Sequence, residues 1–339
     1  MSKFKVVITD YEFSTLGPEE KVLSAVDCEF IKTQSSTEEE VIAAAKDADA
    51  LINQYAPISR KVIESLPNLK VVARYGVGVN TIDVDAATER GVVVSNVTDY
   101  CMDEVSDHAF SLIMACSRKV VLLNNEVKAG NWDYKVSTPI YRLRGRVLGL
   151  VGFGRIPKTL ANKAQAFGIK VMAYDPFVSE EVAENAGVQL VDLNTLCEQS
   201  DFVSLHVPLM KETYHMISDE QFKLMKKETF IINTARGLVI NEKALIRALE
   251  AGEIAGAALD VTEEEPIQKN NPLLKMDQVI INPHTAWYSE EAQLELKIKT
   301  AQNVTDVLSG YYPTYIFNKE VKDKVALKEK NEESVSIRN

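Results

Sequence analysis

The sequence predicts an α/β protein built from two doubly wound parallel sheets, one in each of two domains. The chain has 339 residues, which is enough for two domains. Short apolar runs alternate with helical patterns, as is typical of parallel strands covered by helices on both faces. One complete set of these elements ends near Ser95, and a second set begins at a glycine-rich turn at Gly152. The first set therefore precedes the second as an α/β unit of its own.

The first set, residues 1–98, contains five short runs that we interpret as strands. Helical patterns fill the gaps between them, and Thr37 with Glu40 forms a capping box at the start of one helix. The expected strands are Phe4–Thr9, Glu29–Thr33, Ala50–Asn53, Leu69–Arg74 and Val92–Ser95.

The loop Arg74–Asn80 follows the fourth of these strands and contains Gly76 and Gly78. Two glycines allow a turn whose N–H groups face outward, and such a turn can bind a carboxylate. An ordinary turn before the next helix is an equally good interpretation.

A continuous helical pattern covers residues 103–129 and ends at Gly130. It is apolar on more than one face, so we expect this helix to be buried in a core or in a subunit interface. His108 lies on it and is expected to be a structural histidine rather than a ligand.

The strongest local motif lies between Gly145 and Pro176. An apolar run, Val147–Val151, predicts a buried strand, and a helical pattern then leads to a second apolar run that ends at Asp175. This is the context of a dinucleotide fingerprint, in which glycines let the backbone approach a pyrophosphate and the helix N-terminus attracts that anion. The turn between strand and helix consists of Gly152, Phe153, Gly154, Arg155 and Ile156.

Asp175 predicts that the dinucleotide is NAD. Its carboxylate can accept hydrogen bonds from ribose hydroxyls and would repel a 2′-phosphate. Pro157 replaces the usual third glycine, which affects helix–sheet packing more than phosphate binding, because a proline is tolerated in a first helical turn. An α/β unit with an ordinary glycine turn is the alternative interpretation.

After the fingerprint, polar clusters follow the predicted strands at 201–207, 229–234 and 255–261. Ser218 with Gln221, and Asn241, are expected to cap the helices between them. Ligands of open parallel sheets bind where the carboxyl ends of strands meet, so these clusters are expected to line one crevice.

Three residues in or after these clusters have the chemistry of 2-keto acid reduction: Arg236, Glu265 and His284. An arginine binds a carboxylate bidentately, a histidine passes a proton to a carbonyl oxygen, and a nearby carboxylate orients the histidine and favours its charged form. Taken singly, they are also consistent with a loop arginine, a solvated acidic turn and a capping histidine.

The composition excludes several other classes of protein. The net charge of −11 and the absence of a basic block argue against nucleic-acid or membrane-surface binding. The four cysteines have no metal-binding spacing, so no metal site is predicted and a reduced, cytoplasmic protein is expected. No signal peptide or membrane span is expected either. A last helix is predicted over residues 288–308, and the charge-rich residues 318–339 are expected to be disordered.

Together these motifs resemble the D-isomer-specific 2-hydroxyacid dehydrogenases. The resemblance runs from Phe4 to about Phe317 and rests on RYGVGVNTID, VGFGRI with Asp175, LHVPL, INTARG, ALDVTEEEP and PHTAW, in that order. It implies two Rossmann- or flavodoxin-like domains, with an NAD-binding domain (99–287) inserted into a discontinuous substrate domain (1–98 plus 288–317). It also implies a site in the cleft between them and a homodimer through the nucleotide domain.

The resemblance further implies roles for individual residues. Arg236, Glu265 and His284 match the catalytic residues. The substrate would contact Arg74, Val77, Gly78, Arg236, His284 and Trp287. Beyond the fingerprint and Asp175, the cofactor would contact His206, Val207, Pro208, Thr213, Thr234, Ala235, Arg236, Asp260 and His284.

Two functions remain open at this point. The first is an NAD-dependent reductase of a small 2-keto acid, for which glyoxylate, hydroxypyruvate, pyruvate, phenylpyruvate and 3-phosphoglycerate-related acids all fit. The second is an NAD(H)-sensing binding protein with weak activity, because PHTAWYSEEA is most similar to the branch of the C-terminal binding proteins, which are transcriptional corepressors. That branch also has a tryptophan at Trp287 and an arginine at Arg74.

Overall fold

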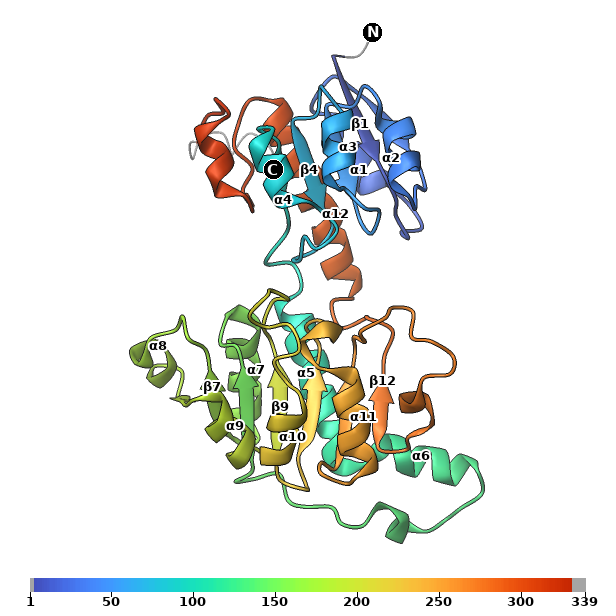
Figure 1. Cartoon of the computed structure of the whole chain (residues 1–339), viewed down its shortest axis with the longest axis vertical. Coiled ribbons are helices and arrows are strands. Elements are labelled where there is room, and N and C mark those ends of the chain that lie inside the picture. Colours follow the sequence, from blue (N-terminus) through green and yellow to red (C-terminus); the bar gives the residue numbers. More distant parts are fainter. Residues whose placement is uncertain (1–2, 331–339) are drawn as a thin grey trace. The chain divides into compact units, whose positions relative to one another are not determined.

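The computed structural model describes residues 3–330 and divides the chain into two compact units (Figure 1). Unit 1 comprises the residues up to Tyr100 together with those from Ser289 onward, and unit 2 comprises Cys101–Tyr288. Each unit contains one parallel sheet with helices packed on it, which confirms the predicted fold class.

The sheet of unit 1 has five parallel strands in the order β2-β1-β3-β4-β5. All five strands expected from the sequence form, with ends shifted by one or two residues at most. They are β1 (Phe4–Ile8), β2 (Cys28–Lys32), β3 (Ala50–Asn53), β4 (Val71–Arg74) and β5 (Val93–Ser95).

Helices cover both faces of this sheet. Helices α2, α3 and α4 share a core with alternate strand residues such as Val7, Leu51 and Val72. Helices α1 and α12 pack against each other, and α12 lies against β3 and β4. The capping box of Thr37 and Glu40 is present at the start of α2. The bounds are α1 (Gly17–Leu23), α2 (Glu38–Ala45), α3 (Arg60–Ser65), α4 (Val84–Glu89) and α12 (Glu290–Leu308).

The expected disorder of residues 318–339 is wrong for residues 318–330. Residues 316–318 run along the edge of β5, where Asn318 accepts a hydrogen bond from the Val94 N–H (2.8 Å) and donates one to the Val92 carbonyl (3.0 Å). The short helix η4 (Lys319–Asp323) follows and buries Val321 completely. Further along the segment, the Tyr312 N–H donates to the Lys328 carbonyl (2.9 Å), and composition reveals none of these contacts. Residues 331–339 lie outside the described part.

The sheet of unit 2 has seven parallel strands in the order β12-β11-β10-β9-β6-β7-β8. Strand order reverses between β6 and β9, and the carboxyl edge at such a switch point is where open α/β sheets bind ligands. The strands are β6 (Val147–Val151), β7 (Lys170–Tyr174), β8 (Gln189–Leu190), β9 (Phe202–Leu205), β10 (Phe230–Asn233), β11 (Gly256–Leu259) and β12 (Val279–Ile281).

Two groups of helices bury the faces of this sheet (Figure 1). Helices α5 and α7 share a core with Leu148 and Ile232, whereas α9, α10 and α11 share one with Val203 and Ile231. None of the helices in residues 3–330 combines the length and the hydropathy that a membrane crossing needs. The bounds are α5 (Met102–Arg118), α7 (Arg155–Ala166), α8 (Glu180–Glu184), α9 (Leu193–Gln199), α10 (Asp219–Leu224) and α11 (Glu242–Glu250).

The prediction of one continuous helix over residues 103–129 is wrong. The chain forms α5 and then α6 (Val120–Lys128), because Lys119 adopts a left-handed conformation (φ 49°) between them. Helix α5 is buried as expected, but all nine residues of α6 are at least partly exposed. A lysine in the left-handed region has no signature in a pattern of apolar residues, so the break could not be predicted.

Candidate active site

The expected catalytic residues follow three strands that are neighbours in the sheet of unit 2. Arg236 follows β10, Glu265 follows β11 and His284 follows β12. The structure brings two of them into direct contact, since Oε2 of Glu265 lies 2.7 Å from Nδ1 of His284. Their side chains are 40% and 38% exposed, so the pair is accessible from solvent.

The environment of Glu265 favours its ionised form. Partial burial raises the pKa of this carboxyl, but several favourable interactions outweigh that effect and hold the pKa below its ordinary value. The hydrogen bond with His284 and the charge of its ring are the largest of them, followed by the Thr262 N–H and the charge of Arg236. Glu265 is therefore a carboxylate at neutral pH and can stabilise a positive charge on His284.

The turn that carries Arg236 is held by Asn233, the last residue of β10. The fully buried Asn233 amide accepts a hydrogen bond from the Ala235 N–H (3.0 Å) and donates one to the Arg236 carbonyl (2.9 Å). Gly237 follows, and a Cβ at this position would lie 1.8 Å from the Thr262 carbonyl oxygen. Only a glycine therefore lets the loop of Arg236 touch the loop of Glu265.

Asp260 supports the turn at His284. Three consecutive N–H groups donate hydrogen bonds to Asp260. The His284 N–H donates to the Asp260 backbone carbonyl (2.8 Å), and the N–H groups of Thr285 and Ala286 donate to the two carboxylate oxygens of Asp260 (both 2.9 Å). His284 has a φ of 51°, which is unfavourable for a residue with a side chain, and these bonds hold it there. The expected contact of Asp260 with the nicotinamide stays a prediction.

His108, on α5, contacts polar groups next to this turn. Its Nε2 lies 3.2 Å from Oδ1 of Asn282 and 3.6 Å from Oδ1 of Asp260. His108 thus contacts the polar groups that support the turn at His284, as expected of a structural histidine. Trp287 is hydrogen-bonded to the same turn, because its indole N–H donates to the His284 carbonyl (3.1 Å).

The fingerprint turn has the geometry that a dinucleotide needs. Gly152 has a φ of 93°, and a Cβ there would lie 2.8 Å from the His206 carbonyl oxygen. Apart from Gly154 and its chain neighbours, no described atom lies within 4 Å of the place where a Cβ of Gly154 would be, so the space beside the N-cap of α7 is open. Pro157 is buried on α7, whose first turn forms normally. An anion can therefore approach the helix N-terminus.

Asp175 connects to this turn directly. Its carboxylate accepts hydrogen bonds from the Phe153 N–H (2.8 Å) and the Phe177 N–H (2.9 Å). The acid at the end of β7 therefore lies beside the glycine-rich turn, at the place where a ribose would follow a pyrophosphate.

The loop after β9 also fits a cofactor site. Burial lowers the pKa of His206 to about 3, so its ring is neutral at physiological pH and is an unsuitable proton donor. The Thr213 hydroxyl closes the loop after Val207 by donating to the Pro208 carbonyl (2.6 Å). Directly after β10, the buried Thr234 hydroxyl has no hydrogen-bond partner among the described residues, and a buried polar group without a partner can be satisfied by a bound ligand.

The remaining expected residues lie in unit 1. Gly76 has a φ of 115°, and a Cβ there would lie 2.2 Å from Nη1 of Arg74, so the guanidinium rests against the backbone of this loop. Val77 is 40% exposed, and its carbonyl accepts a hydrogen bond from Asn96 (2.6 Å). Gly78 follows in the same loop.

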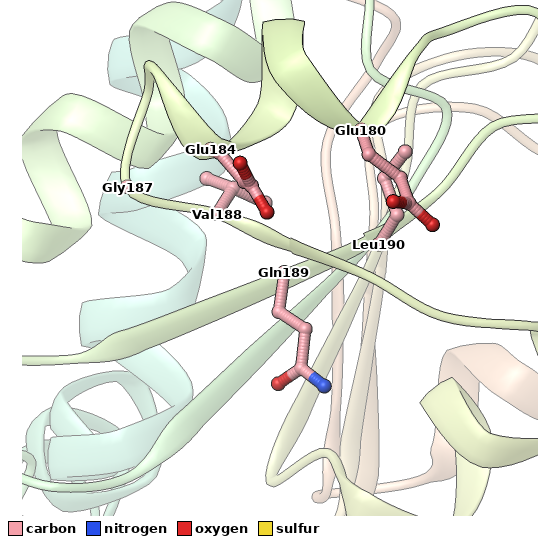
Figure 2. A pocket seen from close by; sticks show the side chains of 6 residues that line it. All are labelled: Glu180, Glu184, Gly187, Val188, Gln189 and Leu190. Carbon is pink, nitrogen blue, oxygen red and sulfur yellow. The ribbon is translucent and has the colours of Figure 1, made fainter.

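A hollow of about 500 Å³ lies elsewhere, at the edge of the unit 2 sheet between α8 and β8 (Figure 2). In Figure 2 the amide of Gln189 points away from the carboxylates of Glu180 and Glu184, so the polar groups do not converge. The hollow is lined by Glu180, Glu184, Gly187, Val188, Gln189 and Leu190, none of which is an expected site residue. It is therefore not part of the candidate site.

Sequence comparison gives a consistent result. The family model for the NAD-binding domain of D-isomer specific 2-hydroxyacid dehydrogenases matches residues 110–286. A glyoxylate reductase of Korarchaeum cryptofilum is 42% identical over 83% of this chain and 86% of its own length. A D-3-phosphoglycerate dehydrogenase of Methanocaldococcus jannaschii is 44% identical over 83% of this chain but only 54% of its own, so this chain spans about half of that relative.

Two solved structures extend the similarity to nearly the whole chain. A glyoxylate reductase from Paecilomyes thermophila has a TM-score of 0.85 at 27% identity and covers 93% of this chain and 98% of its own. A D-lactate dehydrogenase from Aquifex aeolicus, complexed with NAD and lactic acid, has a TM-score of 0.81 at 29% identity and covers 90% of this chain and 96% of its own.

Proposed function

Because the chain belongs to the D-isomer-specific 2-hydroxyacid dehydrogenase family, we propose that it reduces a small 2-keto acid to the D-2-hydroxy acid through Arg236, Glu265 and His284. The matched region is an NAD-binding domain, and NAD is the cofactor. When bound, the cofactor would supply the hydride for reduction in its reduced form, NADH, and accept a hydride in its oxidised form, NAD+. The residues of the chain bind and orient the substrate and handle the proton.

The observation that carries this proposal is the 2.7 Å hydrogen bond between Glu265 and His284. Since Nδ1 of His284 is bonded to the carboxylate, Nε2 is the atom that gives a proton to the substrate oxygen. The ionised Glu265 holds the ring in this tautomer and favours its protonated form. Arg236 follows the neighbouring strand, and its guanidinium binds the substrate carboxylate bidentately.

The proposed cofactor contacts follow from the described geometry. The N–H groups at the N-terminus of α7 would bind the pyrophosphate, and Asp175 the adenosine ribose. The Thr234 hydroxyl supports a contact with the nicotinamide half, because it is buried and has no partner among residues 3–330. The other contacts proposed for that half are Val207, Pro208, Thr213, Ala235 and Asp260.

For the substrate we propose a small 2-keto acid, with glyoxylate as the first to test. Its name occurs in the relative from K. cryptofilum and in the solved structure from P. thermophila. In unit 1, the loop of Arg74, Val77 and Gly78 is proposed to bind the substrate carboxylate through its N–H groups. The corepressor alternative gains no support from the relatives reported above, which are reductases and dehydrogenases.

The test measures NADH oxidation with 2-keto acids of increasing side-chain size, from glyoxylate through pyruvate and hydroxypyruvate to phenylpyruvate and a phosphorylated hydroxypyruvate. We expect turnover with at least one small acid, and the product should be the D-isomer. A wild-type protein that turns over none of them faster than its His284→Ala variant would contradict the proposal and support a sensor.

We also propose a homodimer formed through unit 2. The segment 120–141 exposes several large apolar side chains, among them Trp132 at 89% and Tyr134 at 73%. Large exposed apolar patches mark sites of protein–protein contact, which is why we assign this segment to the dimer interface. Light scattering should give twice the mass of the chain, and Trp132→Asp combined with Tyr134→Asp should give the mass of one chain. A wild-type monomer would contradict this part of the proposal.

A further inference from the structure

The acidic run Glu263-Glu264-Glu265 contains a second histidine–carboxylate pair. Oε1 of Glu263 lies 2.8 Å from Nε2 of His215, which is within ion-pair distance but lacks the alignment of a hydrogen bond, whereas Glu265 is hydrogen-bonded to His284. The side chains of His215 and Glu263 are 25% and 27% exposed, so this pair is less accessible than the proposed catalytic pair. The proposed proton transfer does not use it.

His215 connects two loops of the candidate site. Its side chain contacts Glu263 in the loop after β11, while its backbone N–H donates to the Leu238 carbonyl (2.8 Å) in the loop after β10. Leu238 lies two residues after Arg236. His215 has a φ of 52°, in the left-handed region, and its ring stacks on Tyr214 at a centroid distance of 4.0 Å. The ring is therefore held in place from its own loop.

Glu263 is held from a second side as well. Its Oε1 accepts a hydrogen bond from the backbone N–H of Glu242 (2.9 Å), the first residue of α11. Its own N–H donates to Oε2 of Glu242 (3.3 Å), whose Oε1 accepts a bond from Asn271 (2.7 Å). A carboxylate at the start of a helix is also stabilised by the helix dipole. These contacts fix the acidic loop two residues before Glu265.

We propose that His215 is a positioning residue of the proposed reaction: with Glu263, it holds the acidic loop where Glu265 meets His284 and where Thr262 contacts Gly237 beside Arg236. The proposal rests on the proposed function, and His215 does not touch the reacting atoms. The two loops must stay in register, because a misplacement of about 1 Å can reduce an enzymatic rate by roughly 10²-fold.

The test compares His215→Gln with His215→Ala. The Gln amide nitrogen reaches about as far as Nε2 of histidine, so a glutamine can still contact Glu263, whereas alanine cannot. Both substitutions keep a Cβ, so the strain at a φ of 52° is the same in the two variants. We expect His215→Ala to lower kcat by about tenfold or more, while His215→Gln stays within about threefold of the wild type. NADH binding should change little in either.

A double-mutant cycle tests whether the effect passes through Glu263. If it does, His215→Ala combined with Glu263→Ala should be no slower than the worse single variant, because both remove the same contact. Equal kcat values for His215→Ala, His215→Gln and the wild type would overturn the proposal. The proposal would also be overturned if the kcat losses of the two single variants multiplied in the double variant.

A second measurement does not depend on turnover. Amide hydrogen exchange of residues 261–266 should be faster in His215→Ala than in His215→Gln, and an unchanged rate would overturn the proposal. A wild-type protein without turnover would contradict the proposed function instead, and the exchange rates would still show whether His215 holds the loop. If His215→Ala does not fold, His215→Asn replaces it, because asparagine tolerates left-handed backbone and its amide is too short to reach Glu263.

Discussion

Glu265 and His284 lie 19 residues apart in the sequence, and a hydrogen bond of 2.7 Å joins Oε2 of the first to Nδ1 of the second. The bond connects the loops after two neighbouring strands, β11 and β12. It accounts for much of the lowered pKa of Glu265, and it occupies Nδ1 of His284, which leaves Nε2 for the proposed proton transfer.

Glu265→Gln should move the fall of reduction activity at alkaline pH to lower pH. Glutamine keeps the shape of the side chain but removes the charge that favours the protonated form of His284. The pH profile of kcat measures this shift, with the dissociation constant of NADH as a control that should stay unchanged. An unmoved profile would show that His284 acts without a charged partner.

The lowered pKa of Glu265 also predicts how the stability of the fold depends on pH. Because folding lowers the pKa of Glu265, its contribution to stability is present above the ordinary pKa of a glutamate and is lost as pH falls through the lowered value. Wild-type and Glu265→Gln melting temperatures should therefore differ at neutral pH and converge in acid. A difference that grows in acid would contradict the direction of the pKa shift.

His284→Ala and Arg236→Ala should fail in different ways. Loss of the general acid should lower kcat by about 10²-fold or more with a smaller effect on KM. Loss of the guanidinium should raise KM and lower kcat together, because Arg236 binds the carboxylate in the ground state and in the transition state. Steady-state kinetics on the best keto acid separates the two, and identical patterns would argue against these roles.

Asp175 should make the protein prefer NADH to NADPH. Its carboxylate lies beside the fingerprint turn and would repel a 2′-phosphate. Asp175→Ala combined with Phe177→Arg should shift the preference toward NADPH, since Phe177 is 90% exposed and next but one in sequence. Phe177→Arg alone is the matched control. Equal affinity of the wild type for NADH and NADPH would make this role of Asp175 untenable.

Trp287→Ala should change the ranking of keto acids more than it changes the melting temperature. The indole N–H donates a hydrogen bond to the backbone carbonyl of His284, so its ring lies close to the proposed proton donor. Trp287→Phe keeps an aromatic ring and loses only the N–H donor, which makes it the control for packing. An unaltered ranking with a large drop in melting temperature would indicate a packing tryptophan.

Several features of this protein follow from the sequence alone. The strands, the capping boxes and the fingerprint depend on residues a few positions apart, and their spacing reflects local geometry. Arg236 and Glu265 could be singled out because each follows a predicted strand, and parallel strands bring their carboxyl ends to one edge; His284 could be singled out with the motif PHTAW. Their convergence is thus a consequence of strand direction.

Other features depend on contacts that only the folded chain creates. The pairing of Glu263 with His215, the three amides that surround Asp260 and the packing of Asn318 against β5 join residues distant in sequence. The left-handed backbone of Lys119, His215 and His284 has no counterpart in composition or periodicity. Glu263, Glu264 and Glu265 have identical side chains, so the sequence cannot show which of them contacts which histidine. Strand order and the path of the loop decide it.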